Sequence, residues 1–150
     1  MQSFHSGLYV YANTENPLSM NNAKIHLPDL DFDFKLWKET LAFWKRTGEL
    51  HLLRLSDLHK LGKISSESYG SLRWEYEQQL DKIVALLAKI KVQEDEMAYY
   101  HKDYPINMGH QHYKDYLSIR DRMRQLESYT KDLEEEFDYI NRKVVLPHLH

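Results

Sequence analysis

Hydrophobic residues recur at spacings of three and four over most of the chain beyond residue 33, as they do along one face of an α-helix. The first stripe of this kind consists of Phe34, Trp37, Leu41, Trp44, Gly48, His51, Leu55 and Leu58. Asp31 or Asp33 can cap its start, and Gly62 lies where a C-cap glycine is expected. The pattern predicts a first helix over about residues 33–61.

A second stripe is longer and keeps its phase throughout. It consists of Tyr69, Leu72, Tyr76, Gln79, Ile83, Leu86, Ile90, Gln93, Met97, Tyr100 and Tyr104. Ser65 is a suitable N-cap, and Ile64 and Tyr69 occupy the two positions of a hydrophobic staple. Pro105 should stop the helix, because the residue before a proline is disfavoured in the helical region. We therefore expect a second helix over about residues 66–103.

The third stripe begins beyond a turn-forming segment and extends nearly to the end of the chain. It consists of Tyr116, Ile119, Met123, Leu126, Thr130, Leu133, Phe137, Ile140 and Val144. Asn107 is a candidate cap for the first turn, and Pro147 should end the helix. These signals predict a third helix over about residues 108–145, followed by a mobile tail over 147–150.

The three stripes predict an all-α fold. Their seven-residue repeat favours left-handed supercoiling, and short connections make neighbouring helices antiparallel. For residues 33–146 we expect an elongated antiparallel three-helix bundle with coiled-coil heptads. The alternative is a compact globule in which the three helices cross at steep angles.

Residues 1–32 have a different character. A loop-like segment at 13–22, rich in Asn with Pro and Ser, separates a short apolar run at 8–11 from the alternating sequence IHLPDLDFDF at 25–34. We expect an extended N-terminal arm that lies on the bundle.

Composition narrows the classes of function. A net charge of −3 and a pI near 6.3 argue against binding to nucleic acid or to an anionic membrane. The chain has no cysteine, which excludes a disulfide framework and thiol catalysis. We find no signal peptide, and no apolar run approaches the roughly 20 residues of a membrane span. The expected location is the cytoplasm.

The segment HKDYPINMGHQH, residues 101–112, is the place to look for metal chemistry. His101, His110 and His112 would lie within one or two helical turns of each other, with Asp115 nearby. Imidazole and carboxylate are suitable ligands for zinc or iron. A metal site formed by these four residues is therefore one interpretation.

The other interpretation is that the segment is only a turn between two helices. Pro105, Asn107 and Gly109 are typical turn residues. Carboxylate-bridged di-iron bundles need a glutamate followed three residues later by a histidine, and the chain contains no such pair. We favour the turn and predict no metal, with the histidine site kept as the alternative.

His51 occupies a core position of the first stripe. Tyr76 should lie roughly level with it, and Glu136 or Asp138 could accept a hydrogen bond from its ring. A lone histidine on an apolar face is expected to be a hydrogen-bonded core residue rather than a ligand or a base.

Gln79, Gln93 and Gly48 also interrupt the apolar stripes. The two glutamines are interpreted like His51, since polar core positions commonly fix register in coiled coils. Gly48 should admit a bulky neighbour or permit a bend, and the alternative is a ligand pocket at that level. No glycine-rich phosphate loop or nucleophile elbow accompanies these residues, so we expect no catalytic residue and no cofactor.

The expected helix lengths leave apolar surface uncovered. Pairing outward from the first turn places Phe34 opposite about Gln93, so the second and third helices should project beyond the first by on the order of 15–20 Å. The exposed interaction surface predicted there consists of Tyr99, Tyr100, Tyr104, Tyr113 and Tyr116. The arm or a second copy of the protein should cover this surface.

The first helix also carries apolar residues beside its main stripe, namely Leu36, Phe43, Leu50 and Leu53. A stripe this broad is typical of a helix that contacts more than two neighbours. We therefore predict an antiparallel homodimer that forms through the first helix or through the hairpin tips.

Two stretches, FWKRTGELHLLRLSDLHK at 43–60 and HKDYPINMGHQHYKDYLSIRDRMRQLESYTKDLEEEFDYI at 101–140, carry a resemblance. Over residues 34–145 the chain resembles small uncharacterised helical proteins of Bacteroidetes-type bacteria. Those proteins have an aromatic FWK segment that opens a helical hairpin, and a turn with an aromatic residue and proline before a histidine pair. The resemblance implies a helical fold and no particular activity.

These observations favour a non-enzymatic helical interaction or scaffold protein whose partner is itself or another protein. The alternative function is a helical bundle that binds a metal or a small ligand, either at the histidine-containing tip or at the level of His51.

Overall fold

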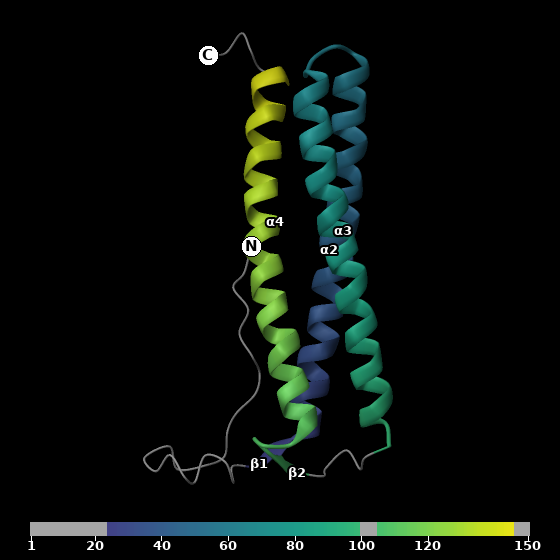
Figure 1. Ribbon diagram of the computed structural model, residues 1–150, viewed down its shortest axis with the longest axis vertical. Helices are drawn as coiled ribbons and strands as arrows, with labels where there is room; N and C mark the ends of the chain where they lie inside the picture. The colour runs from purple at the N-terminus through teal and green to yellow at the C-terminus, as the bar shows by residue number, and fades with distance from the viewer. Residues whose placement is uncertain (1–23, 100–104, 146–150) are drawn as a thin grey trace, which may run out of the picture. The chain divides into compact units, whose positions relative to one another are not determined.

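The computed structural model describes residues 24–99 and 105–145 of the 150-residue chain. The elements, in chain order, are β1 (Lys24–His26), α2 (Leu27–Lys60), α3 (Ser66–Met97), β2 (Pro105–Asn107) and α4 (Gln111–Val145) (Figure 1). The three long helices pack against one another, which confirms the all-α three-helix bundle. None of the described helices is apolar enough over a sufficient length to cross a membrane.

α2 begins six residues earlier than the apolar spacing predicts. Pro28 is favoured in a first helical turn because its φ is preset and its missing N–H is not needed there. Asp29, also in the first turn, carries the charge that favours a helix N-terminus. Residues 27–32 therefore belong to the bundle, and the assignment of the whole of 1–32 to an extended arm is wrong.

Asp31 and Asp33 consequently lie inside α2 rather than at its cap. Asp31 forms an ion pair with Lys35, one helical turn later, at 2.9 Å. Asp33 has no exposed surface and faces the core of the bundle. Predicting either residue as the N-cap was wrong, because the helix starts upstream of both.

The turn after α2 is a Schellman motif. The Lys63 N–H donates to the Leu58 carbonyl at 2.8 Å, and the Gly62 N–H donates to the His59 carbonyl at 3.0 Å. Gly62 has a φ of 69°, a conformation that costs glycine little and other residues more. The predicted C-cap glycine is confirmed.

α3 starts where the sequence predicts and ends earlier. The Ser65 hydroxyl accepts a hydrogen bond from the Ser68 N–H at 3.1 Å, which confirms Ser65 as the N-cap. The helix ends at Met97, and residues 98–99 form a turn. These two residues were predicted to be helical and are not. Residues 100–103 of the predicted helix lie outside the described residues.

A two-stranded antiparallel sheet joins the segment before α2 to the segment before α4. Ile25 pairs with Ile106, and both side chains are buried while their neighbours in the strands are exposed. The expected extended structure is therefore confirmed for residues 24–26. Residues 105–107, expected to be part of a turn, form the partner strand instead.

The chain divides into two compact units, and each is described by itself. Unit 1 comprises Met1–Thr40 and Leu86–Arg124, and unit 2 comprises Leu41–Ala85 and Gln125–His150. Each unit contains a segment of all three helices. The buried core of unit 1 includes Ile25, Leu30, Phe34, Trp37, Ile90, Ile106, Tyr116, Ile119 and Met123. That of unit 2 includes Leu41, Trp44, Leu55, Leu58, Leu72, Tyr76, Ile83, Leu126 and Leu133.

Candidate functional site

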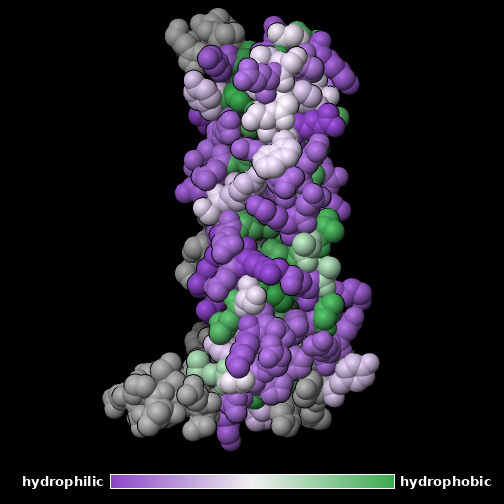
Figure 2. Space-filling model, viewed as in Figure 1, coloured by the Kyte–Doolittle hydropathy of each residue, from purple (hydrophilic) through white to green (hydrophobic). Residues whose placement is uncertain are grey.

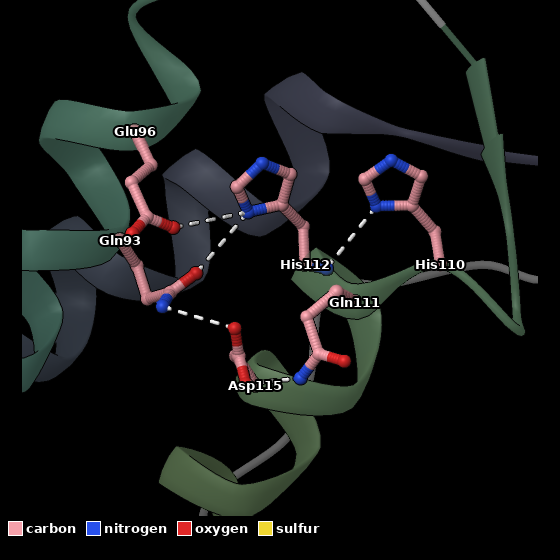
Figure 3. Close-up of polar contacts among 6 residues, drawn as sticks. All are labelled: Gln93, Glu96, His110, Gln111, His112 and Asp115. Carbon is pink, nitrogen blue, oxygen red and sulfur yellow. Dashed lines mark hydrogen bonds and ion pairs between the residues drawn. The ribbon is translucent and has the colours of Figure 1, made fainter.

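His110 is the N-cap of α4. Its carbonyl accepts hydrogen bonds from the N–H groups of Tyr113 and Lys114, each at 3.1 Å. Its ring atom Nδ1 accepts another from the His112 N–H at 3.1 Å (Figure 3). The bonds from His112 and Tyr113 satisfy N–H groups that would otherwise have no partner at the start of a helix, and the bond from Lys114 is the first regular bond of α4. The ring of His110 therefore supplies the capping acceptor that Ser, Thr, Asp or Asn usually provides.

Asn107 was expected to be this cap and is not. Its side-chain Oδ1 accepts a hydrogen bond from the Gly109 N–H at 3.0 Å, and its carbonyl accepts one from the His110 N–H at 3.1 Å. Asn107 thus closes the turn between β2 and α4, and the helix begins at Gln111 rather than near residue 108.

A chain of side-chain hydrogen bonds connects α3 to this end of α4. His112 Nδ1 lies 3.2 Å from Gln93 Oε1, and Gln93 Nε2 donates to Asp115 Oδ2 at 3.2 Å. Gln111 Nε2 donates to Asp115 Oδ1 at 2.8 Å, and Glu96 Oε2 lies 3.8 Å from His112 Nδ1 (Figure 3). Because Oε1 of Gln93 can only accept, Nδ1 of His112 carries the proton.

Three residues of the alternative metal site, His110, His112 and Asp115, lie in this cluster and form hydrogen bonds there. The rings of His110 and His112 stack at 5.1 Å, and their Nδ1 atoms face the His112 N–H and Gln93. Asp115 accepts two amide hydrogen bonds, and His101 lies outside the described residues. Within 24–99 and 105–145, no three His, Cys, Asp or Glu side chains are arranged to hold a metal ion.

An aromatic cluster adjoins the polar residues in unit 1. Tyr116 stacks on Trp37 with ring centroids 5.2 Å apart, and Phe34 meets Tyr116 edge to face at 5.9 Å. The Tyr116 hydroxyl donates to Asp33 Oδ2 at 2.5 Å. Both groups are fully buried, so this hydrogen bond ties α4 to α2 inside the core.

This packing corrects the predicted tyrosine surface. Tyr116 is fully buried and Tyr113 is 5% exposed, since Phe34 and Trp37 of α2 pack on the Tyr116 ring and the Tyr113 ring stacks on Tyr116. Neither tyrosine is available to a partner in this structure, and the expected uncovered projection of α3 and α4 at their level is wrong. Tyr99 is 91% exposed, while Tyr100 and Tyr104 lie outside the described residues.

His51 and Tyr76 form a polar layer in unit 2, which we call the neutral layer. Its Nδ1 lies 3.0 Å from the Tyr76 hydroxyl, which donates to the Leu133 carbonyl at 3.2 Å. The ring also stacks on Phe137 with centroids 3.7 Å apart. The predicted hydrogen-bonded core histidine level with Tyr76 is confirmed, although its bonding partner is Tyr76 rather than an acidic residue of α4.

Burial sets the titration of this layer. It lowers the pKa of His51 below the ordinary histidine value, against a smaller opposing effect of the Asp138 charge. It also raises the pKa of Tyr76, with the charges of Glu134 and Glu136 acting in the same direction. Both residues are thus held in their neutral forms. This suits a structural hydrogen bond.

Gly48 makes room for a buried glutamine. A Cβ atom added at Gly48 would lie 2.7 Å from Gln79 Oε1. Gln79 is buried, and its Nε2 donates to the Thr130 hydroxyl at 2.9 Å. Its Oε1 has no hydrogen-bond partner. The prediction that Gly48 admits a bulky neighbour is confirmed, and the neighbour is Gln79. The alternative prediction was a ligand pocket at this level, and the Gln79 side chain lies there instead.

The outward side of α2 is unusually apolar. The four residues that the sequence placed beside the main stripe are all exposed, at 40% for Leu36, 60% for Phe43, 58% for Leu50 and 62% for Leu53. The face of the molecule in Figure 2 is mostly hydrophilic, with smaller hydrophobic areas. Phe32 and Leu61 are exposed too and were missed, although both lie at helical spacings from the same set.

Comparisons of the chain with protein-family models, curated proteins and solved structures find no match. The resemblance to small helical proteins of Bacteroidetes-type bacteria therefore stays a prediction.

Proposed function

We propose that this protein is a non-enzymatic helical scaffold that binds a second copy of itself through the outer face of α2. We define this face by Phe43, Leu50 and Leu53, which belong to unit 2. The observation that carries the proposal is their exposure, since each of the three large apolar side chains is about 60% exposed. Exposed apolar side chains that gather on one face mark interaction sites.

The spacing of these residues favours a helical partner. Phe43 and Leu50 are separated by one heptad, and Leu53 follows three residues later, as in the seam between two packed helices. Each helix of such a pair presents a narrow apolar stripe with charged residues beside it. The exposed residue Arg46 lies within this stripe, three residues after Phe43 and four before Leu50, and the exposed residue Glu49 lies beside it.

Self-pairing accounts for the charges as well as the apolar residues. In an antiparallel pair with its two-fold axis near residue 48, Phe43 of one copy faces Leu53 of the other. The same register places Arg46 of one copy opposite Leu50 of the other, next to Glu49. A two-fold axis repeats each favourable pair, so a short face is used twice. Antiparallel pairing of α2 is therefore the arrangement that we propose.

Sedimentation velocity over a range of micromolar concentrations tests the proposal. The unmodified chain should form a dimer, and Phe43→Lys or Leu50→Lys should shift it to monomer, because a buried lysine would be desolvated without a partner. Val84→Lys is the matched control, since Val84 is 54% exposed on α3 and outside this face. A monomer at every concentration, or a dimer that Val84→Lys weakens equally, would overturn the proposed interface.

A further inference from the structure

We propose that Ser66 is an acyl-acceptor site, which His59 activates for reaction with a small acyl phosphate. Ser66 Oγ lies 3.1 Å from His59 Nε2. At this separation a base can take the proton of a nucleophilic hydroxyl, and the pair is typical of an activated serine when a third group holds the base. The site is separate from the face proposed for pairing, which consists of Phe43, Leu50 and Leu53.

The turn between α2 and α3 fixes the backbone of both residues. His59 lies in the last turn of α2, and Ser66 is the first residue of α3. The His59 carbonyl accepts a hydrogen bond from the Gly62 N–H at 3.0 Å, so its backbone is part of the Schellman motif. Ser65 fixes the start of α3 because its hydroxyl accepts a hydrogen bond from the Ser68 N–H. Two capped helix ends therefore carry the pair.

The Tyr69 ring holds the imidazole of His59 in place. The two rings stack with centroids 4.5 Å apart and planes 10° apart. Tyr69 in turn packs against the core cluster that contains Leu55 and Leu72. Since the stacked ring cannot turn freely, Nε2 stays directed at Ser66 Oγ. Tyr69 is thus a positioning residue that acts through His59.

The reaction transfers an acyl group to the serine. In the reactive tautomer the ring proton of His59 is on Nδ1, so Nε2 accepts the hydrogen bond from the hydroxyl. Ser66 Oγ attacks the carbonyl carbon of the acyl phosphate and forms a new C–O bond. The bond from that carbon to the phosphate oxygen breaks, and phosphate leaves with the electron pair. Nε2 takes the hydroxyl proton and passes it to the released phosphate. Each Ser66 reacts once, so the product is a modified scaffold.

The surroundings of Ser66 favour a small anionic donor. Ser66 is exposed, so such a donor reaches it without a rearrangement of the chain. The exposed side chains of Lys60 and Lys63 add positive charge to the same turn. They outnumber the one carboxylate adjacent to Ser66 in sequence, that of Glu67, and so attract an anion. Because the pair supplies only a nucleophile and a base, the donor needs a good leaving group, as an acyl phosphate has.

Treatment of the full chain with acetyl phosphate, followed by mass spectrometry of peptides, tests the proposal. Ser71 is the matched reference, because it is an exposed serine of α3 that lies one helical turn beyond the first turn. Ser66 should be acetylated at least about tenfold faster than Ser71, given the effect of a positioned general base. His59→Phe keeps an aromatic ring against Tyr69 and removes the base, so it should lower the rate at Ser66 to that at Ser71.

The part of Tyr69 is tested with the same reaction. Tyr69→Phe keeps the stacked ring and should leave the rate at Ser66 unchanged, whereas Tyr69→Leu should lower it by severalfold. An unchanged rate in Tyr69→Leu would mean that stacking does not position His59.

Two results would overturn the acceptor site itself. One is equal acetylation of Ser66 and Ser71 in the unmodified chain, which would mean that His59 gives no assistance. The other is a fast reaction of Ser66 in His59→Phe, which would assign the reactivity to the start of α3. Circular dichroism shows that each variant is folded. Neither result bears on the pairing through α2, which sedimentation velocity measures separately.

Discussion

The two units of the bundle bury polar groups of different kinds. Unit 1 encloses the carboxyl group of Asp33, which accepts a hydrogen bond from Tyr116. Unit 2 encloses the neutral groups of Gln79 and Thr130, and beside them Tyr76 bonds to a backbone carbonyl. The Tyr116 hydroxyl lies 2.5 Å from its acceptor and the Tyr76 hydroxyl lies 3.2 Å from the Leu133 carbonyl, so the two hydrogen bonds should differ in their contribution to stability.

The largest expected effect sets the baseline for this comparison. Leu30 in unit 1 and Leu55 in unit 2 are both fully buried. Leu30→Ala and Leu55→Ala should each lower the free energy of unfolding by about 2–5 kcal/mol through a lost side chain and a residual cavity. Urea unfolding followed by circular dichroism measures both. If the losses of unfolding free energy in the two variants differ by more than about 3 kcal/mol, the width of the range for such cavities, the apolar cores of the two units are not equivalent.

The second prediction concerns the tyrosine pair directly. Tyr116→Phe removes the hydroxyl that donates to Asp33 and should cost about 1.5–3 kcal/mol. Tyr76→Phe removes two hydrogen bonds, one to the Leu133 carbonyl and one with His51, and should cost about 0.5–1.5 kcal/mol for each. The same unfolding measurement applies. A loss per hydrogen bond in Tyr76→Phe that equals the loss in Tyr116→Phe would contradict the distinction between the units.

Two glycines of unit 2, Gly48 and Gly70, test how tightly Gln79 packs against α2. Gly70 in α3 has no atom within 4 Å of an added Cβ, so Gly70→Ala should stabilise the protein by about 0.5–1 kcal/mol. Gly48→Ala should instead be about 0–2 kcal/mol less stable, because Gln79 must move and overpacking exceeds the helix propensity gained. Thermal unfolding of both variants checks this. A stabilising Gly48→Ala would show that Gln79 relaxes freely.

The smallest expected effect is the pH dependence of the neutral layer in unit 2. Burial lowers the pKa of His51 in the folded protein, so the unfolded chain takes up a proton first as pH falls. The stability due to neutral His51 is thus present above its ordinary value of 6.5 and is lost as pH falls through the lowered folded value. His51→Leu should remove this part of the pH dependence and be tolerated at neutral pH. An unaltered profile in His51→Leu would contradict the assignment.

Much of the fold follows from local signals in the sequence. The apolar spacing identified the buried faces of all three helices, and Ser65 and Gly62 marked the turn between α2 and α3 because their capping geometry is local. The early start of α2 was harder to predict. Leu30, Phe32 and Phe34 alternate as in a strand, yet Leu30 and Phe34 also continue the helical stripe.

The features that escaped prediction depend on residues distant in sequence or on unusual chemistry. Pairing of Ile25 with Ile106 joins segments separated by two long helices, and no local pattern encodes it. Burial of Tyr113 and Tyr116 depends on contacts of Tyr116 with Phe34 and Trp37, which lie about 80 residues earlier in the chain. His110 was considered as a metal ligand rather than a cap, because histidine is not among the residues favoured at the N-cap.

One distance tests the central claim that α2 pairs with a second copy. The chain has no cysteine, so Ala42→Cys, at an exposed position next to Phe43, gives a single site for a nitroxide label. In the proposed register the two labels are offset by 12 residues, about 18 Å along paired helices whose axes lie about 8–10 Å apart. Pulsed electron resonance should detect a defined coupling at this distance, and Val84→Cys should give a different, longer one. Absence of intermolecular coupling at Ala42→Cys, or a shorter distance at Val84→Cys, would contradict pairing through the outer face of α2.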